Sequence, residues 1–552
     1  MQKSLISIPD KGDIFGGLTA GIVALPLALA FGVQSGMGAA AGLYGAIFLG
    51  FFAALFGGTP VQISGPTGPM TVVSAATIAS FVGGASGLEG VLHAIIATFI
   101  LAGLCQILMG VLKLGSYIRY IPYPVVSGFM SGIGLIIILY QLFPALGLAS
   151  PSSTIAVATQ LPGALSSINF TSLLYTTLTI VIIYLLPKIL KSVPSTLVAL
   201  LAITILSLVL KIEIPIIGDI PQGFPKLHLH HLLAFDTKWT WTVIEAAITL
   251  AALGAIDSLL TSVVADNVTK TKHDSNKELI GQGIGNSIAG LFGGLPGAGA
   301  TMRTLVNVRS GGKNRISGII HSVILLIIVL GLGQYASLIP KSVLAGILIT
   351  VGIGILDYKS LKHISKIPRT DAVIMVFVLL ITVFFDLLIA VGVGILLSSL
   401  LFMKKMGDLM EENSKLVSLD NISQDFMRPD ESIPAPLSTK IFVKHVDGPL
   451  FFGSATGFQN ILQKMPETLY VIIRLEKVPY IDQTGLYALE DSIIMLEKRG
   501  IEVLFVGLQP QPRQRLEAIH LIPDLILEGQ LFDRFDDCVS YILRLENPNS
   551  KK

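Results

Sequence analysis

The chain has 552 residues and a formal net charge of +2; 52% of its residues are hydrophobic and only 13% are charged. The charged fraction is about half that of a typical soluble domain, which excludes a wholly soluble protein. The small net charge argues neither for nor against nucleic acid, and no nucleic-acid partner is predicted. The two cysteines, Cys105 and Cys538, lie in different regions and indicate no disulfide framework.

The charges are spread unevenly along the chain. Of the 74 charged residues, 39 lie in positions 401–552. We therefore expect a transmembrane transport domain over residues 1–405, a polar, proline-containing linker over 406–437 and a soluble domain over 438–552. The N-terminus is short and polar before its first apolar run. Because this is not the pattern of a signal peptide, the first helix is expected to remain in the membrane.

A helix that spans a bilayer needs about 20 apolar residues. Candidate spans begin near residues 14, 39, 91, 122, 172, 194, 243, 279, 316, 342, 371 and 389. Two further stretches, near residues 67 and 300, are broken by glycine or proline and are too short to span as ordinary helices. When they are counted as spans, the total is fourteen, with seven in each half.

The distribution of Lys and Arg supports this count. If the N-terminus is cytoplasmic, the loops that follow even-numbered spans carry 15 Lys and Arg residues, as expected for the cytoplasmic side. The loops after odd-numbered spans carry only four, which are Lys211, Lys226, Lys238 and Lys341. Since seven is an odd number, the second half is expected to be inverted relative to the first.

An internal repeat indicates where the two halves meet. Leu55–Pro60 (Leu-Phe-Gly-Gly-Thr-Pro) returns 236 positions later as Leu291–Pro296 (Leu-Phe-Gly-Gly-Leu-Pro), and Gly45 and Gly281 keep the same offset. Each copy ends an apolar segment and precedes one of the broken stretches. In transporters built from inverted repeats, broken helices border the substrate site near the bilayer midplane. Kinks that serve only helix packing are the alternative.

Both broken stretches read as an extended segment that leads into the N-terminus of a helix. Thr67 and Gly68 lie at the first helix start, and Thr301 lies at the second. The unpaired N–H groups of a helix start, with about half a positive charge, favour anions. Arg303, in the first turn of the second helix, adds a full positive charge. We therefore predict a site for a small anion between the two helix ends.

One carboxylate, Asp257, interrupts the apolar run that begins near residue 243. Left unpaired in a span it costs on the order of several kcal/mol, so it needs a partner or a function. Thr261 lies four residues on, on the same helix face. Carboxylate, hydroxyl and freed carbonyl oxygens suit Na⁺; protonation of Asp257 and a structural pair with Arg303 are the alternatives. Gln34 and Tyr44 are weaker polar candidates that could face a cavity, although both residue types more often pack.

From about residue 438 the pattern changes to strands that alternate with helices, which indicates a small α/β domain. The segments 469–474 and 501–507 are predicted to be buried strands. Between them, Asp482 and Thr484 lie where an amphipathic helix begins. An N-cap is the simpler interpretation of this turn, and phosphorylation or a nucleotide contact is the alternative.

Together these segments resemble a known family. The apolar part resembles the SulP anion transporters and the tail resembles their STAS domain, over nearly the whole chain. The stretches that carry the resemblance are 16–20, 66–71, 254–261 and 296–303. Within the family the chain is most similar to the BicA-type sodium-dependent bicarbonate transporters, which have Asp where proton-coupled relatives more often have Glu. The resemblance implies seven plus seven inverted spans in core and gate subdomains, a cytoplasmic STAS domain and a homodimer.

The resemblance also implies roles for individual residues. It implies a Na⁺ site formed by Asp257, Thr261, Gly299 and Thr301. Thr67 and Ala300 would border bicarbonate. Thr484 matches the position that is phosphorylated, as Ser or Thr, in the anti-sigma-factor antagonists.

We therefore expect a secondary active anion transporter of the plasma (inner) membrane, which uses Na⁺ as the coupling ion and no other cofactor. Its predicted reaction is bicarbonate uptake by an elevator-type movement. A sulfate or other oxyanion permease, either proton-coupled or an exchanger, is the alternative in the same class. A membrane-anchored STAS regulator is the alternative in another class. An enzyme is not indicated, because the sequence has no nucleophile–base constellation, metal-spaced cluster or phosphate loop.

Overall fold

The structure is a computed structural model, and its chain forms two compact units, Met1–Leu396 and Leu397–Lys552. The structure describes residues 10–83, 87–151, 153–190, 194–211, 214–217, 223–229, 236–385, 387–413, 416–418, 437, 440–463, 465 and 467–546.

The described residues of the first unit contain a helix at each of the fourteen predicted positions. These helices are α1 (Lys11–Gln34), α2 (Ala39–Phe56), α3 (Gly68–Gly83), α4 (Leu88–Val111), α5 (Tyr123–Ala145), α7 (Phe170–Ile189), α8 (Ser195–Val209), α10 (Thr240–Thr269), α11 (Ser275–Leu291), α12 (Thr301–Arg309), α13 (Arg315–Ala336), α14 (Lys341–Ile355), α16 (Arg369–Phe384) and α17 (Leu387–Asn413). Among the described helices, seven are long and apolar enough to cross a membrane. The two helices that follow the broken stretches, α3 and α12, have only 16 and 9 residues.

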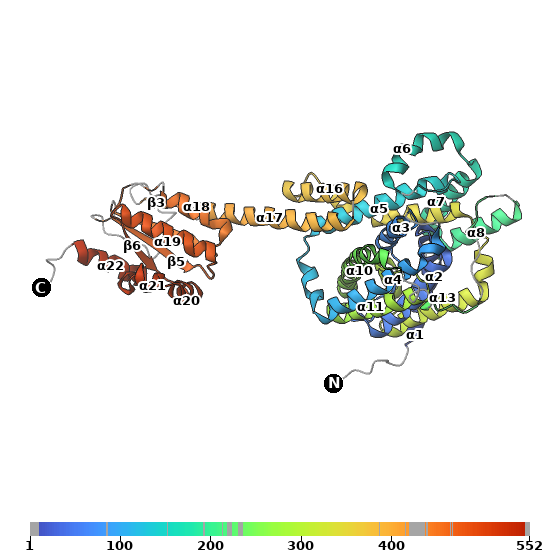
Figure 1. Cartoon of the computed structure of the whole chain (residues 1–552), viewed down its shortest axis with the longest axis horizontal. Helices are drawn as coiled ribbons and strands as arrows, with labels where there is room; N and C mark the ends of the chain where they lie inside the picture. Colours follow the sequence, from blue (N-terminus) through green and yellow to red (C-terminus); the bar gives the residue numbers. More distant parts are fainter. Residues whose placement is uncertain are drawn as a thin grey trace. The chain divides into compact units, whose positions relative to one another are not determined.

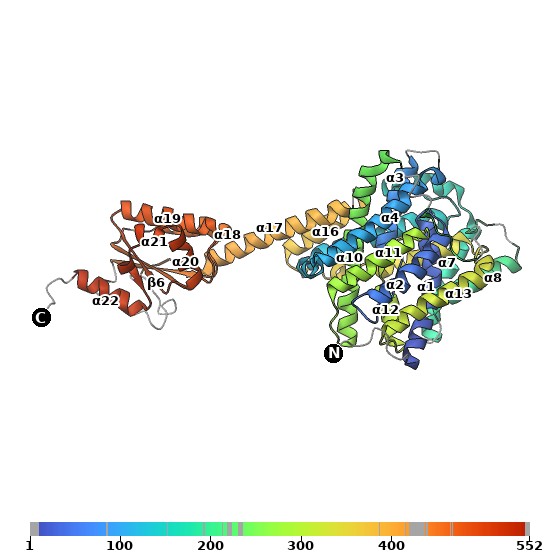
Figure 2. The same ribbon diagram turned by 60° about the horizontal axis from the view of Figure 1, so that its bottom comes forward.

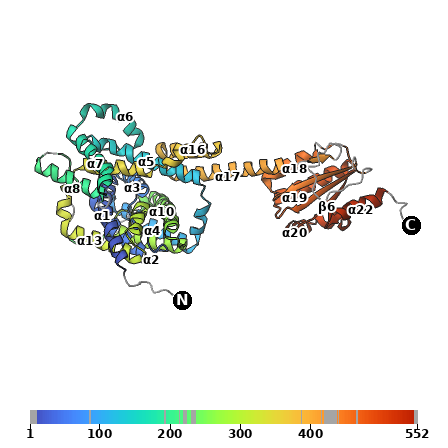
Figure 3. The ribbon, with the colours of Figure 1, turned by 180° about the vertical axis from the view of Figure 1, so that it is seen from behind.

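The helices of the first unit pack in two groups. One group contains α1–α4 and α10–α13; the other contains α5, α7 and α8 with α14 and α16. Figures 1 and 3 show α5, α7 and α16 above the first group, together with the short helix α6 (Thr154–Ala164). Within the first group, α1 packs on α12 and α13 while α10 packs on α3 and α4, and Figure 2 shows α4, α10 and α11 side by side. This matched pairing is what inverted repeats produce.

The repeated phrase has a packing role in both halves. A Cβ on Gly281 of α11 would lie 2.3 Å from the backbone nitrogen of Gly57, which belongs to the first copy. A Cβ on Gly45 of α2 would lie 2.2 Å from the carbonyl oxygen of Leu295, which belongs to the second copy. Each copy therefore rests directly on the matching glycine of the other repeat, where no side chain fits.

The second unit is built on a five-stranded sheet. Its strands, in spatial order, are β3 (Leu416–Ser418), β4 (Ile441–Asp447), β5 (Tyr470–Lys477), β6 (Glu502–Val506) and β7 (Leu531–Phe532). The first pair is antiparallel and the others are parallel, as expected when helices connect successive strands. The connecting and flanking helices are α18 (Phe452–Gln463), α19 (Gln483–Lys498), α20 (Pro510–Ala518), α21 (Leu521–Asp524) and α22 (Phe535–Glu546).

The two predicted strands of this domain correspond to β5 and β6. Of the predicted linker, the structure describes the end of α17 and the short strand β3; most of the remainder lies outside the described residues. The predicted domain boundaries therefore stay a prediction.

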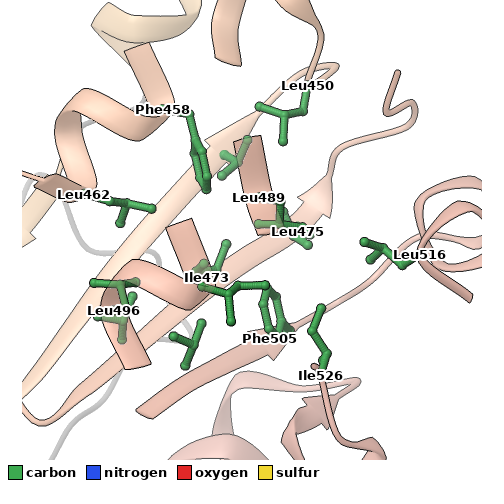
Figure 4. Packing of buried hydrophobic residues seen from close by; sticks show 14 of the residues in the cluster. Leu450, Phe458, Leu462, Ile473, Leu475, Leu489, Leu496, Phe505, Leu516 and Ile526 are labelled. Atoms are coloured by element: carbon green, nitrogen blue, oxygen red, sulfur yellow. The ribbon is translucent and has the colours of Figure 1, made fainter. Parts of the chain in front are cut away.

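Apolar side chains cover both faces of the sheet. On one face, Phe458 of α18 and Leu489 of α19 pack against Ile473 and Phe505 of the central strands, as Figure 4 shows. On the other face α22 contributes a smaller cluster that contains Cys538, a free thiol. Burial, reinforced by the charge of Glu502, raises the pKa of this thiol to about 12.

Candidate functional site

Two very short strands hold the broken stretches together. Strand β1 (Ser64–Gly65) pairs antiparallel with β2 (Ala298–Gly299), and the Ala300 N–H donates to the carbonyl oxygen of Ile63 at 2.8 Å. The chain then enters α3 at Gly68 and α12 at Thr301. Two elements related by an inverted repeat meet in opposite directions, so an antiparallel pair brings both helix starts to one place.

Asp257 of α10 touches the first of these helix starts. The Thr67 hydroxyl, on the residue just before α3, donates to Asp257 Oδ2 at 2.7 Å. The Asp257 side chain is almost fully buried, with 7% of the residue's surface exposed. A residue predicted to contact a cation and one predicted to border the anion are therefore in direct contact.

Oxygen atoms gather one turn further along α10. The Thr261 hydroxyl donates to the carbonyl oxygen of Gly299 at 2.9 Å and lies 2.7 Å from the Thr301 hydroxyl. Thr261 is fully buried. The four predicted Na⁺ ligands thus come from only two places, one face of α10 and the junction between β2 and α12. Carboxylate, hydroxyl and carbonyl oxygens are hard donors of the kind that alkali and alkaline-earth ions prefer.

Arg303 acts on the site through the backbone. Its guanidinium is buried, with 2% of the residue exposed, and Nη2 donates to the carbonyl oxygen of Pro66 at 2.5 Å. A Cβ on Gly65 would lie 2.6 Å from Arg303 Nη1, so a side chain there would displace the guanidinium. No ion pair joins Arg303 and Asp257 among the described residues; Asp257 accepts from Thr67 instead.

Gly68 lies where the two helix groups meet. A Cβ there would lie 2.7 Å from Ile137 Cδ1 of α5 and 2.9 Å from Ile355 Cδ1 of α14. The absence of a side chain lets Ile137 and Ile355 of the opposite helix group approach the start of α3 closely. The predicted anion residue therefore belongs to the first group but faces the second.

The sequence reasoning missed two serines on the same face of α10. Ser258 Oγ accepts from the Gly299 N–H at 3.1 Å, while Ser262 Oγ bonds to Thr59 Oγ1 at 2.7 Å and to Gln62 Oε1 at 3.0 Å. Both serines directly follow a predicted ligand in the sequence. This spacing of one, four and five residues after Asp257 defines a single helix face and was available as a signal.

The larger omission is a polar stripe on α11. Glu278 Oε2 accepts from the N–H groups of Gly58 and Thr59 at 2.8 Å each, and its Oε1 accepts from the side-chain amides of Gln62 and Gln282. Gln282 also donates to Ser64 Oγ at 2.6 Å.

Asn286 continues the stripe one turn further and holds the second broken stretch. Its side-chain oxygen accepts from the Gly297 N–H at 2.9 Å, and its amide nitrogen donates to the Gly297 carbonyl at 3.0 Å. Glu278, Gln282 and Asn286 are spaced by four residues, so one face of α11 clamps both broken stretches.

In the second unit, Asp482 and Thr484 lie at the start of α19. Asp482 is the N-cap, since its Oδ1 accepts from the Gly485 N–H at 2.8 Å, and this confirms the simpler interpretation of the turn. Thr484 is exposed beside it. Its predicted regulatory role stays a prediction.

Comparison with known proteins connects this arrangement to a family. Residues 11–378 match the model of the sulfate permease family, and residues 432–538 match the STAS domain. The bicarbonate transporter BicA of Picosynechococcus is 42% identical over 517 residues, which cover 93% of this chain and 91% of that protein. The chain belongs to the sulfate permease family. It is therefore an anion transporter of the SulP type, and the expectation of a transporter rather than an enzyme is confirmed.

Solved structures of relatives agree with the observed architecture. The transmembrane domain of a cyanobacterial BicA is 47% identical and aligns with a TM-score of 0.65, covering 69% of this chain and 97% of that domain. The murine Solute Carrier 26 family member A9 anion transporter is 20% identical, with a TM-score of 0.82 over 98% of this chain and 92% of that chain. The predicted fold class, a helical multi-pass transporter with a C-terminal STAS domain, is confirmed.

Proposed function

We propose that this transporter couples the uptake of bicarbonate to the entry of Na⁺. The anion is held at the starts of α3 and α12, by Thr67, Gly68, Ala300 and Thr301. Na⁺ binds beside it, to Asp257, Thr261, Gly299 and Thr301. The similarity to bicarbonate transporters over most of both chains supports bicarbonate as the anion.

The bond between Thr67 and Asp257 is the observation that carries the proposal. A carboxylate about 5 Å from a bound anion repels it by about 3 kcal/mol at an effective dielectric constant of about 20. A cation on Asp257 removes this repulsion and leaves the helix N-termini and Arg303 to attract the anion. Anion binding therefore depends on the cation, which is the requirement for coupled transport.

We further propose that the anion crosses by movement of the α1–α4 and α10–α13 group past the other group. The whole candidate site belongs to the first group, and a Cβ on Gly68 would meet the second group at the methyl ends of Ile137 and Ile355. A carrier that moves with its site intact needs such a smooth apolar contact, because no buried polar bond has to break at the boundary.

The excess of Lys and Arg in the loops after even-numbered spans supports a cytoplasmic N-terminus and a cytoplasmic STAS domain in a plasma membrane. We also propose a homodimer as the working form. Protease digestion of sealed vesicles tests the orientation, and cross-linking of the protein in membranes tests the dimer.

Uptake into liposomes tests the proposed function. The purified full chain is reconstituted, and uptake of labelled bicarbonate and labelled sulfate is measured separately under an inward Na⁺ gradient, an inward K⁺ gradient and a pH gradient without Na⁺. We expect bicarbonate uptake that rises at least tenfold with the Na⁺ gradient and little sulfate uptake. Uptake of sulfate alone, or bicarbonate uptake driven equally by K⁺ or by protons, contradicts the proposal.

A further inference from the structure

A cavity of about 670 Å³ lies between the two helix groups, away from the candidate site. It is lined by the C-terminal ends of α1 and α5, by the second half of α3 and by the first residues of α7 and α14. Ala75 is the lining residue of α3 nearest in sequence to Gly68; seven residues separate them, which is about 10 Å along a helix. The cavity is therefore a separate space on the same boundary.

Several buried polar atoms of this lining have no partner. Ser172 and Ser342 are 0% and 2% exposed, and neither hydroxyl oxygen has a hydrogen-bond partner among the described residues. The same holds for both side-chain amide atoms of Gln34. A buried polar group without a partner costs about 1–3 kcal/mol, so a cluster of them around one cavity indicates something that binds there.

The charge of the lining favours an anion. Lys341, at the start of α14, is its only charged residue among those the structure describes. The carbonyl groups at the ends of α1 and α5 are already used: Ser35 N–H donates to Phe31, and Leu146 N–H donates to Leu142 and Phe143. The C-terminal ends of α1 and α5 and the N-terminal ends of α7 and α14 all border the cavity, so their dipoles, negative and positive, roughly balance. The ammonium, the amide and the hydroxyls can all donate.

The two serines lie on neighbouring helix starts. The Thr176 hydroxyl, in the second turn of α7, donates to the carbonyl oxygen of Ser342 in the first turn of α14 at 2.9 Å, which ties the two helices together. Ser172 lies one turn before Thr176, and its Oγ would lie 2.8 Å from a Cβ on Gly147, another lining residue. Both serines therefore belong to helices that border the cavity, rather than to loops.

We propose that this cavity is a second anion subsite, in which Lys341, Ser172, Ser342 and Gln34 hold a small oxyanion on one side of the membrane before it reaches α3 and α12. The identity of the anion rests on the proposed function; the presence of the subsite does not. The loop charges place the cavity opposite the cytoplasmic side, since Lys341 follows an odd-numbered span.

Sidedness of uptake provides the test. Lys341→Gln, the double variant Ser172→Ala with Ser342→Ala, and the wild type are assayed as full chains in vesicles of both orientations. Lys211→Gln is the matched control, because Lys211 is an exposed lysine in a loop of the same predicted side and does not line the cavity. With bicarbonate supplied from the cavity side, we expect both test variants to raise its half-saturation concentration about 5- to 10-fold. The maximal rate, the Na⁺ half-saturation and uptake from the other side are expected to stay within twofold of wild type.

Two results overturn the subsite. One is an unchanged bicarbonate half-saturation in both test variants, which means that the cavity holds water only. The other is an equal rise in Lys211→Gln, which means that surface charge alone is responsible. If the wild type carries sulfate instead of bicarbonate, the proposed function fails, and the same variants assayed with sulfate still decide on the subsite. The serine variants keep the test valid if Lys341→Gln folds poorly, and the reverse also holds.

Discussion

Helices α1 and α10 occupy equivalent places in the two repeats but do different chemistry. When Leu291 is matched to Leu55, Asp257 and Thr261 of α10 correspond to Gly21 and Leu25 of α1. The polar face of α10 bonds to both broken stretches, whereas α1 packs closely through glycine: a Cβ on Gly17 would lie 2.4 Å from the carbonyl oxygen of Ser317 in α13. The fold is repeated, whereas the polar residues of the proposed cation site are present in one repeat only.

The asymmetry extends to the helix starts. Thr67 is the last residue before α3, and Ala300 is the last residue before α12. Neither partner of the Thr67–Asp257 bond has an equivalent in the opposite repeat: Ala300 occupies the position of Thr67, and Gly21 occupies the position of Asp257. In the proposed mechanism, a symmetric scaffold thus supplies two helix N-termini for one anion, while a single repeat supplies the residues that make anion binding depend on a cation.

Removal of the Asp257 carboxylate from α10 is expected to have the largest effect on transport, because this residue distinguishes α10 from α1. We expect Asp257→Asn to lower Na⁺-driven bicarbonate uptake at least 100-fold, because an amide cannot compensate the charge of Na⁺ in a buried site. The yield of folded protein, measured by size-exclusion chromatography in detergent, should remain near that of wild type. Glu245→Gln is the control, since it removes an exposed carboxylate from the same helix and should leave uptake within twofold. Na⁺-driven uptake by Asp257→Asn would be the contrary result.

Thr67→Val tests the bond that joins the two sites. It replaces the hydroxyl with a methyl group of similar shape and leaves Asp257 without this donor. A hydrogen bond to a charged group is worth about 1.5–3 kcal/mol, so we expect the bicarbonate half-saturation concentration to rise about tenfold or more. Thr67→Ser restores the hydroxyl and should recover uptake to within about threefold. Equal behaviour of the Val and Ser variants would show that the hydroxyl has no part in coupling.

The polar stripe of α11 sharpens the same contrast. Glu278 corresponds to Gly42 of α2, where a Cβ would lie 1.9 Å from the carbonyl oxygen of Ala28, so the first repeat has no room for a side chain there. We expect Glu278→Gln to destabilise the folded protein by about 2 kcal/mol, because an amide cannot accept all four hydrogen bonds. The melting temperature in detergent should fall by several degrees relative to wild type and to Glu245→Gln. An unchanged melting temperature would show that the clamp is dispensable.

Substitution of Ala300, which corresponds to Thr67 in the other repeat, is expected to have the smallest effect on transport. Ala300→Ser adds a hydroxyl at the start of α12, where α1 presents no carboxylate to receive it. We expect the bicarbonate half-saturation concentration in uptake assays to stay within threefold of wild type, in contrast to the tenfold or greater rise expected for Thr67→Val. A change of tenfold or more would mean that the two helix starts are chemically equivalent after all.

The fold could be predicted from the sequence because its signals are local or periodic. Apolar runs mark the spans, loop charges give their direction, and the repeated phrase exists because its glycines rest on Gly45 and Gly281 of the opposite repeat. The strand-to-helix breaks were visible for the same reason, since glycine and proline interrupt an otherwise apolar run.

The remainder depends on contacts between distant segments. The residue match between the two breaks could not be read at a constant offset, because the stretch from Leu55 to the start of α3 is longer than the stretch from Leu291 to the start of α12. Thr67 therefore corresponds in structure to Ala300 rather than to Thr301. Most hydrogen-bond partners of Glu278 belong to the opposite repeat, so its role could not be assigned without the fold.

Mutual dependence of the two ligands tests the central claim most directly. Bicarbonate binding to the purified protein is measured by calorimetry over a series of Na⁺ concentrations, and Na⁺ binding over a series of bicarbonate concentrations. Linkage requires that each ligand strengthens the other by the same factor, which we expect to be at least tenfold in the wild type and absent in Asp257→Asn. Bicarbonate affinity that does not change with Na⁺ in the wild type would contradict the account.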